Sequence, residues 1–305
     1  MILLASPGQG AQSPGFLQPW LEVPGVADRL AWWSAVTGLD LVRYGTTADA
    51  EEIRDTAVAQ PLLVAAALAA YEALYPGGER PDAVAGHSVG ELAAAAISGV
   101  LSPEAALVLV RERGRAMAEA AAVTETGMTA VLGGDAEEVL AAIDKHGLTP
   151  ANVNGAGQVV AAGTVERLAE FADAPPAKAR LRPLSVAGAF HTEHMAPAVA
   201  TLERLAPGAP VADPAITLLS NRDGAVVTEG RDYLSRLVAQ VSAPVRWDAC
   251  MATMRELGVT AIIELPPAGT LVGLARRELK GVELLALKGP EDLDKARELI
   301  KAHTS

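Results

Sequence analysis

The chain is poor in cysteine, in long apolar runs and in blocks of like charge. Its single cysteine, Cys250, excludes an intramolecular disulfide, and the apolar pattern from Trp247 to Met251 indicates a buried structural thiol. The longest apolar run, Leu62 to Tyr71, is too short to span a bilayer and predicts a buried helix. No basic segment precedes the apolar start Met1 to Ala5, so we find no secretory signal and expect a cytoplasmic protein.

Acidic side chains outnumber basic ones. The 37 Asp and Glu against 25 Lys and Arg leave a formal net charge of -12. Such a charge disfavours general affinity for nucleic acid or an anionic membrane, and we expect neither as a partner. Half of the 305 residues are hydrophobic, which suffices for a large core.

Strand and helix patterns alternate in the first part of the chain. The predicted strands are Ile2–Ser6 and Ala83–Ala85, and the predicted helices are Gln60–Leu74, Glu91–Ile97 and Ser102–Ala122. Ser102 is a typical N-cap, and Pro103 suits the first helical position. This order predicts an α/β layered domain.

A different order begins near residue 125. The predicted elements there are strand Met128–Leu132, helix Asp135–His146, strands Thr149–Val153 and Gln158–Ala162, helix Val165–Ala172 and strand Ala179–Val186. Asn154-Gly155-Ala156-Gly157 is a hairpin signal, and the β-α-β-β-α-β order is typical of ferredoxin-like domains. Beyond it we predict helices Glu193–Leu205, Asp232–Val241 and Arg246–Leu257, and strands Ile216–Ser220 and Ala261–Glu264. Residues 125–187 are therefore interpreted as a small domain inserted into a large one formed by 1–124 and 188–305.

The segment Gly86-His87-Ser88-Val89-Gly90 matches the nucleophile elbow Gly-x-Ser-x-Gly. Glycines flank the serine because the turn from strand to helix is too tight for side chains. The elbow would place the hydroxyl of Ser88 at a helix N-terminus, where backbone N–H groups stabilise an oxyanion. The alternative is an ordinary glycine turn with a capping serine, but a predicted strand precedes the motif and a predicted helix follows it.

A serine hydroxyl needs a base to become a good nucleophile, and the chain has five histidines. Three are poorly placed. His303 lies in the tail and His146 at a helix end, and His87 lies inside the elbow, where its ring should point away from the serine. His191 and His194 remain, and on a helix they would share a face. A metal site needs a third protein ligand, and Glu193 would face elsewhere, so we expect no metal. The long stretch 192–305 after His191 disfavours the chain order of an α/β-hydrolase esterase.

Six segments together resemble one family, the malonyl-CoA:acyl carrier protein transacylases of fatty acid and polyketide synthesis. They are Pro7–Gln12, Gly86–Glu91, Arg113–Arg115, Asn152–Gln158, Gly188–His191, and Gln240 shortly before Pro244–Trp247. The resemblance covers nearly the whole chain. It implies an α/β-hydrolase-like catalytic subdomain with a parallel sheet, and an inserted ferredoxin-like subdomain.

The resemblance also implies the catalytic residues. Ser88 would be the nucleophile, and His191 would be its general base. Gln240 would orient His191 through its backbone carbonyl, in place of the usual acid. The backbone N–H groups of Gln9 and Val89 would form the oxyanion hole. The alternative for the glycines beside Gln9, a dinucleotide-binding fingerprint, lacks its third glycine.

Further residues would select the substrate. Arg113 would hold the malonyl carboxylate bidentately, although composition alone favours a solvated arginine in a mixed-charge stretch. Phe190 would favour malonyl over methylmalonyl because its ring limits the space for the acyl group. The alternative interpretation of Phe190 is a core aromatic without a role in selection. Asn152 and Asn154 are expected to contact the substrate. The implied partners are malonyl-CoA and acyl carrier protein, and no cofactor is expected besides the coenzyme A thioester itself.

The carrier protein is acidic, so it would dock on a local basic patch. Candidates are Arg276, Arg277 and Lys280, or Arg180 and Arg182, each of which is otherwise a solvated charge. Three other functions stay open: a thioesterase or esterase, a catalytically silent scaffold, and a domain of a larger synthase. The first motif lies close to Met1 and no long linker flanks the motifs, which favours a free-standing enzyme.

Overall fold

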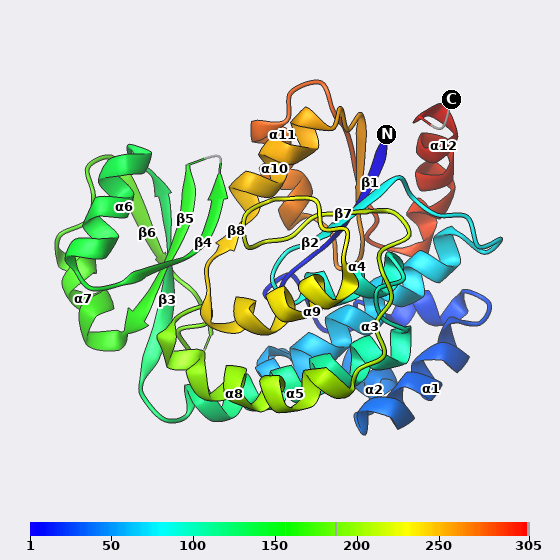
Figure 1. Cartoon of the computed structure of the whole chain (residues 1–305), viewed down its shortest axis with the longest axis horizontal. Helices are drawn as coiled ribbons and strands as arrows, with labels where there is room; N and C mark the ends of the chain where they lie inside the picture. The colour runs from blue at the N-terminus through cyan, green and yellow to red at the C-terminus, as the bar shows by residue number, and fades with distance from the viewer. Residues whose placement is uncertain (156, 187, 304–305) are drawn as a thin grey trace.

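Two β-sheets organise the chain, which a computed structural model describes over residues 1–155, 157–186 and 188–303. Figure 1 shows the mixed sheet of the smaller subdomain with its two helices on the left, and the parallel sheet of the larger subdomain surrounded by helices on the right. The hairpin residue Ala156 and the expected boundary residue 187 lie outside the described residues. The prediction of an α/β chain with two subdomains is confirmed.

A five-stranded parallel sheet forms the centre of the larger part, in the order β10-β9-β1-β2-β7. Its strands are β1 (Ile2–Ser6), β2 (Ala83–Gly86), β7 (Thr217–Leu218), β9 (Ala261–Glu264) and β10 (Glu283–Ala286). The central strands are buried throughout, as expected for a sheet covered on both faces. Ser6 pairs with Gly86, so the segments that carry Gln9 and Ser88 leave the same edge of the sheet.

The mixed sheet of the smaller subdomain also has five strands, in the order β6-β3-β5-β4-β8. Its strands are β3 (Thr126–Gly133), β4 (Thr149–Gly155), β5 (Gln158–Thr164), β6 (Ala179–Pro183) and β8 (Val245–Arg246). The first four pair antiparallel in ferredoxin-like order, and β8 adds a parallel strand beside β4. Helices α6 (Ala136–Lys145) and α7 (Val165–Asp173) cover its outer face and enclose a separate apolar core (Figure 1).

The remaining helices pack around the parallel sheet. They are α1 (Val26–Thr37), α2 (Leu41–Thr46), α3 (Thr56–Leu74), α4 (Gly90–Ile97), α5 (Pro103–Ala121), α8 (Ala196–Leu205), α9 (Gly230–Ala239), α10 (Trp247–Glu256), α11 (Thr270–Glu278) and α12 (Leu293–His303). By length and composition α3 could cross a membrane, but 78% of its apolar window is buried inside the protein. It is the core helix predicted from the apolar run. Asp55 caps its N-terminus, and the helix begins at Thr56, four residues before the predicted start.

Helices α3 and α5 approach each other closely, and a glycine permits this. A Cβ atom on Gly114 would lie 2.9 Å from the carbonyl oxygen of Thr56, so no larger residue fits without a backbone shift. Ser102 accepts a hydrogen bond from the N–H of Ala105 and caps α5, with Pro103 at the first helical position. The close approach places the neighbouring Arg113 beside Gln60 of α3.

Several elements differ from their predicted extents. The predicted helix at 246–257 begins one residue later, because Val245 and Arg246 pair with β4 instead. Strand β6 ends at Pro183, three residues before the predicted end, although the N–H of Leu184 still donates to the Met128 carbonyl of β3 at 2.9 Å. Thr192 caps a short 3₁₀ turn, η3 (Glu193–Met195), so α8 starts only at Ala196. Strand β7 is shorter than predicted, and the sequence patterns missed α1, α2, β10 and α12.

Candidate active site

Ser88 lies in a strained turn between β2 and α4. Its φ of 53° is left-handed, a conformation that costs energy for a residue with a side chain. A Cβ on Gly86 would come within 2.0 Å of the Gly90 carbonyl carbon, and one on Gly90 would come within 2.2 Å of the Ser6 carbonyl oxygen. These two glycines therefore permit the sharp turn, and the geometry is that of a nucleophile elbow.

The hydroxyl of Ser88 lies against the ring of His191. The distance from Ser88 Oγ to His191 Nε2 is 2.7 Å, and the distance from His191 Nδ1 to the carbonyl oxygen of Gln240 is 2.8 Å. A carbonyl oxygen only accepts, so Nδ1 carries the proton and Nε2 is left free to accept the proton of the hydroxyl. Burial, helped by the charge of Arg113, lowers the pKa of His191 to about 3, which keeps the ring neutral at physiological pH.

The second candidate histidine stands apart from this pair. His194 is part of the 3₁₀ turn after Thr192 and is half-buried, and its N–H donates to the hydroxyl of Thr192 at 3.3 Å. Within the described part of the chain, no three His, Cys, Asp or Glu side chains gather closely enough to hold a metal ion.

One N–H group of the elbow, that of Val89, has no partner among the described residues. The N–H groups of Ser88, Gly90 and Glu91 donate to Asn221 Oδ1, the His87 carbonyl and the Ser88 carbonyl, at 2.7, 2.9 and 3.0 Å. Among the residues that the structure describes, none accepts from the N–H of Val89 or of Gln9. Both residues line the cavity in front of Ser88, so these two donors can serve an oxyanion there.

Arg113 carries a buried positive charge beside the serine. It is 3% exposed, and its guanidinium donates to Gln60 Oε1, to Gln240 Oε1 at 2.9 Å and to Ser88 Oγ at 3.5 Å. Burial lowers its pKa to about 10, so it stays charged at neutral pH. The solvated arginine favoured by composition is thus wrong for Arg113. Because its hydrogen-bond partners are two neutral amides and a neutral hydroxyl, the guanidinium can still take up a carboxylate.

A chain of amide and hydroxyl groups supports Arg113 from behind. Gln60 Nε2 donates to Thr56 Oγ1 at 2.8 Å, and that hydroxyl donates to Gln9 Oε1 at 2.8 Å. The segment that carries one candidate oxyanion donor is thus linked to the arginine. Sequence reasoning missed Gln60, although a glutamine in a helix of alanine and leucine was a visible signal for a buried polar role.

A cavity of about 260 Å³ opens in front of Ser88, between the two sheets. Asn152 and Asn154 reach it from β4 of the mixed sheet. The Oδ1 of Asn154 lies 2.8 Å from Nε2 of His87, so the elbow and the mixed sheet are joined across the cavity. As predicted, His87 takes no part in the Ser88–His191 contact.

Phe190 closes one side of this cavity and is 8% exposed. The neighbouring Gly188 permits its position, since a Cβ there would meet Ala121 Cβ at 2.8 Å and the Phe190 ring at 3.0 Å. An acyl group on Ser88 would therefore share its space with an aromatic ring. This arrangement fits the predicted role of Phe190 in size selection.

The comparisons with known proteins agree with this geometry. The profile of the family described as "Acyl transferase domain" matches residues 7–296. Malonyl CoA-acyl carrier protein transacylase of Mycobacterium tuberculosis (strain ATCC 25618 / H37Rv) is 55% identical over 302 residues, 98% of this chain and 100% of that protein.

Solved structures agree as well. The crystal structure of MCAT from Mycobacterium tuberculosis is 55% identical and has a TM-score of 0.94 over 97% of this chain and 99% of that one. A malonyl-transacylase solved with a type II PKS acyl-carrier protein has a TM-score of 0.93 at 31% identity, over 98% and 99% of the two chains. The chain therefore belongs to the acyl transferase domain family, within its malonyl-CoA:acyl carrier protein transacylases.

Proposed function

We propose that the protein transfers a malonyl group from malonyl-CoA to the phosphopantetheine thiol of acyl carrier protein, through a malonyl-Ser88 intermediate. The observation that carries this proposal is one cavity that holds both an activated serine and a buried, charged guanidinium, 3.5 Å apart. The names of the relatives support the same reaction. It supplies extender units for fatty acid synthesis, and the relative solved with a type II PKS acyl-carrier protein supports a second use in polyketide synthesis.

In the first half-reaction His191 Nε2 accepts the proton of Ser88 as Oγ attacks the thioester carbonyl carbon. The oxyanion that forms accepts hydrogen bonds from the N–H groups of Val89 and Gln9, which need no reorganisation. The C–S bond then breaks, and the imidazolium returns its proton to the leaving thiolate of coenzyme A. Gln240 stabilises the imidazolium through its carbonyl oxygen, without a carboxylate in the triad.

The second half-reaction reverses these steps with a different thiol. The pantetheine thiol of the carrier gives its proton to His191, and the sulfur attacks the malonyl-Ser88 ester. Collapse of the second oxyanion releases malonyl-carrier and returns the proton to Ser88 Oγ. The serine and histidine supply the nucleophile and the base themselves, so we propose that catalysis needs no metal or cofactor besides the thioester substrate.

Arg113 selects malonyl because the acyl group carries a free carboxylate. Its guanidinium lies within 3.5 Å of Ser88 Oγ, so an acyl group of three carbons on that oxygen places its terminal carboxylate beside the guanidinium. Asn152 and Asn154, on the opposite wall, are proposed to contact the substrate as well. Fixing the malonyl end at Arg113 also keeps the ester in one orientation, which we propose favours the carrier thiol over water.

The carrier protein is proposed to dock on α11. The first half of this helix lines the cavity through Thr270, Leu271 and Leu274, and its exposed second half carries Arg276 and Arg277, followed by Lys280. These cations suit an acidic partner whose prosthetic arm must enter the cavity. Arg180 and Arg182 lie on β6, an edge strand of the mixed sheet that β3 and β5 separate from β4, and suit this purpose less well. The cytoplasm is the proposed compartment.

The transfer is tested on the carrier itself. Purified holo-carrier, malonyl-CoA and catalytic amounts of enzyme are mixed, and the mass of the carrier is followed. We expect a gain of one malonyl group with the wild type and none with Ser88→Ala. Free malonate without malonyl-carrier would contradict the proposal and indicate a thioesterase.

A further inference from the structure

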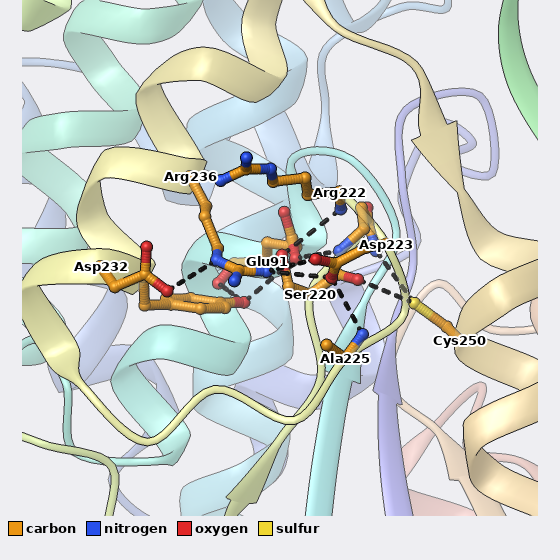
Figure 2. Close-up of polar contacts among 10 residues, drawn as sticks. Glu91, Ser220, Arg222, Asp223, Ala225, Asp232, Arg236 and Cys250 are labelled. Carbon is orange, nitrogen blue, oxygen red and sulfur yellow. Dashed lines mark hydrogen bonds and ion pairs between the residues drawn. The ribbon is translucent and has the colours of Figure 1, made fainter.

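A second buried carboxyl group lies directly behind the site. Glu91 follows Ser88 by three residues in α4 and is 1% exposed. Its Oε1 accepts from the N–H of Asn221 at 2.7 Å and from the hydroxyl of Tyr233 at 3.3 Å, and its Oε2 accepts from Nε2 of Gln240. Figure 2 shows the polar groups around Glu91, which lies between Asp232 and Arg236 on one side and Cys250 on the other.

The contact with Gln240 determines how that amide is turned. Its Oε1 accepts from Arg113 at 2.9 Å, while its Nε2 faces Glu91 and also donates to the Ser88 carbonyl at 3.2 Å. An amide has one accepting end and one donating end. An acceptor at Glu91 therefore turns the oxygen of Gln240 toward the guanidinium, where it is needed.

We propose that Glu91 is a positioning residue for malonyl recognition: its carboxylate fixes the Gln240 amide, which in turn aims the Arg113 guanidinium at the malonyl carboxylate. The inference rests on the proposed role of Arg113. It adds a residue on α4 that contacts neither the substrate nor His191.

The isosteric change Glu91→Gln separates this role from support of the serine. The backbone N–H of Asn221 is fixed and keeps the single carbonyl oxygen of the new side chain. The new NH2 group then faces Nε2 of Gln240, so two donors meet and Gln240 must turn over. Its NH2 then faces Arg113, which loses an acceptor. The turn breaks the 3.2 Å bond from Gln240 Nε2 to the Ser88 carbonyl, but the bond from the Ser88 N–H to Asn221 Oδ1, at 2.7 Å, is left intact and still holds the serine backbone.

Glu91 is ionised in mildly alkaline solution, above its pKa. Burial raises its pKa to about 7, while its hydrogen bonds and the charge of Arg113 act to lower it. Arg236 is occupied by Asp223 at 2.9 Å and by Asp232 at 2.8 Å. Burial raises the pKa of Cys250 and of Tyr233, so both stay neutral. An assay at pH 8 therefore measures the carboxylate.

The test compares two reactions of the same serine. Loading by malonyl-CoA depends on Arg113, whereas labelling by an uncharged alkyl fluorophosphonate depends on Ser88, its base and the oxyanion hole, and offers Arg113 no carboxylate to bind. For Glu91→Gln we expect kcat/KM for malonyl-CoA to fall about tenfold or more, as for one lost hydrogen bond to a charged group, and the labelling rate to stay within about threefold. The loss should appear mainly in KM.

Tyr233→Phe is the matched control, because it removes a contact to Glu91 and leaves Gln240 untouched. Its ratio of the two rates should equal that of the wild type. All rates are expressed per site that the phosphonate can label, which counts only folded enzyme. A preparation that folds poorly therefore still gives the ratio of the malonyl-loading rate to the labelling rate. Equal losses in both reactions of Glu91→Gln, or a control that shifts the ratio as much, would overturn the inference. A wild type that is labelled but never malonylated would instead refute the proposed function.

Discussion

Removing the guanidinium of Arg113 should convert the protein from an enzyme selective for malonyl into an unselective one. A bidentate contact to the malonyl carboxylate comprises two charge-assisted hydrogen bonds, each contributing about 1.5–3 kcal/mol. Because such contributions are not additive, we take about 3–4 kcal/mol for the pair. That corresponds to a loss of roughly 10²- to 10³-fold in kcat/KM for malonyl-CoA in Arg113→Ala.

Acetyl-CoA has no carboxylate, so its slow loading should change little in the same variant. The assay is kcat/KM for both thioesters, together with the partition of the acyl-enzyme between carrier and water, where we expect more hydrolysis. Arg111→Ala is the matched control: it lies on the same helix, but its guanidinium donates to the Thr37 and Ala57 carbonyls, at 3.1 and 3.3 Å. An unchanged malonyl-to-acetyl ratio in Arg113→Ala would refute the assigned role, and an unchanged partition would refute the protection from water.

Three further predictions concern size selection, the elbow and pH. Phe190→Ser should raise the methylmalonyl-to-malonyl ratio of kcat/KM by about 10- to 100-fold. An unchanged ratio would show that the ring packs against the cavity without selecting the acyl group. Gly90→Ala should lower the free energy of unfolding by about 1–3 kcal/mol and slow phosphonate labelling, because its Cβ would meet the Ser6 carbonyl at 2.2 Å. The pKa of Glu91 is raised from 4.5 to about 7, so the protonated form stabilises the fold below pH 4.5 and that contribution is lost as the pH rises through 7. Denaturant unfolding should therefore show the stability of the wild type relative to Glu91→Gln falling by about 2–3 kcal/mol from pH 5 to pH 8, and a constant difference would refute it.

The elbow was predictable from sequence because its information is local. Two glycines around Ser88, with a buried strand before them and a helix after, determine the turn without reference to distant residues. The resemblance to a known family then supplied His191, Gln240 and Arg113, whose separation along the chain conceals that they meet. For Arg113 the composition pointed to solvent, and only the close packing of α5 on α3 explains its burial.

The residues behind the site could not be predicted in the same way. Glu91 and Asn221 are 130 positions apart, and their bond depends on β7 lying beside β2. The short strand β8 illustrates the same limit, since Val245–Arg246 becomes a strand only because β4 offers an edge. Local patterns describe which elements form, whereas pairing between distant segments decides where these groups meet.

The central claim is that Ser88 carries the malonyl group between two thiols. The most direct measurement is the intact mass of the protein after brief exposure to malonyl-CoA, with Ser88→Ala and acetyl-CoA as controls. The account predicts a gain of one malonyl group on the wild type alone, which disappears when acyl carrier protein is added. A wild type that gains no mass, or an adduct that persists in Ser88→Ala, would contradict it.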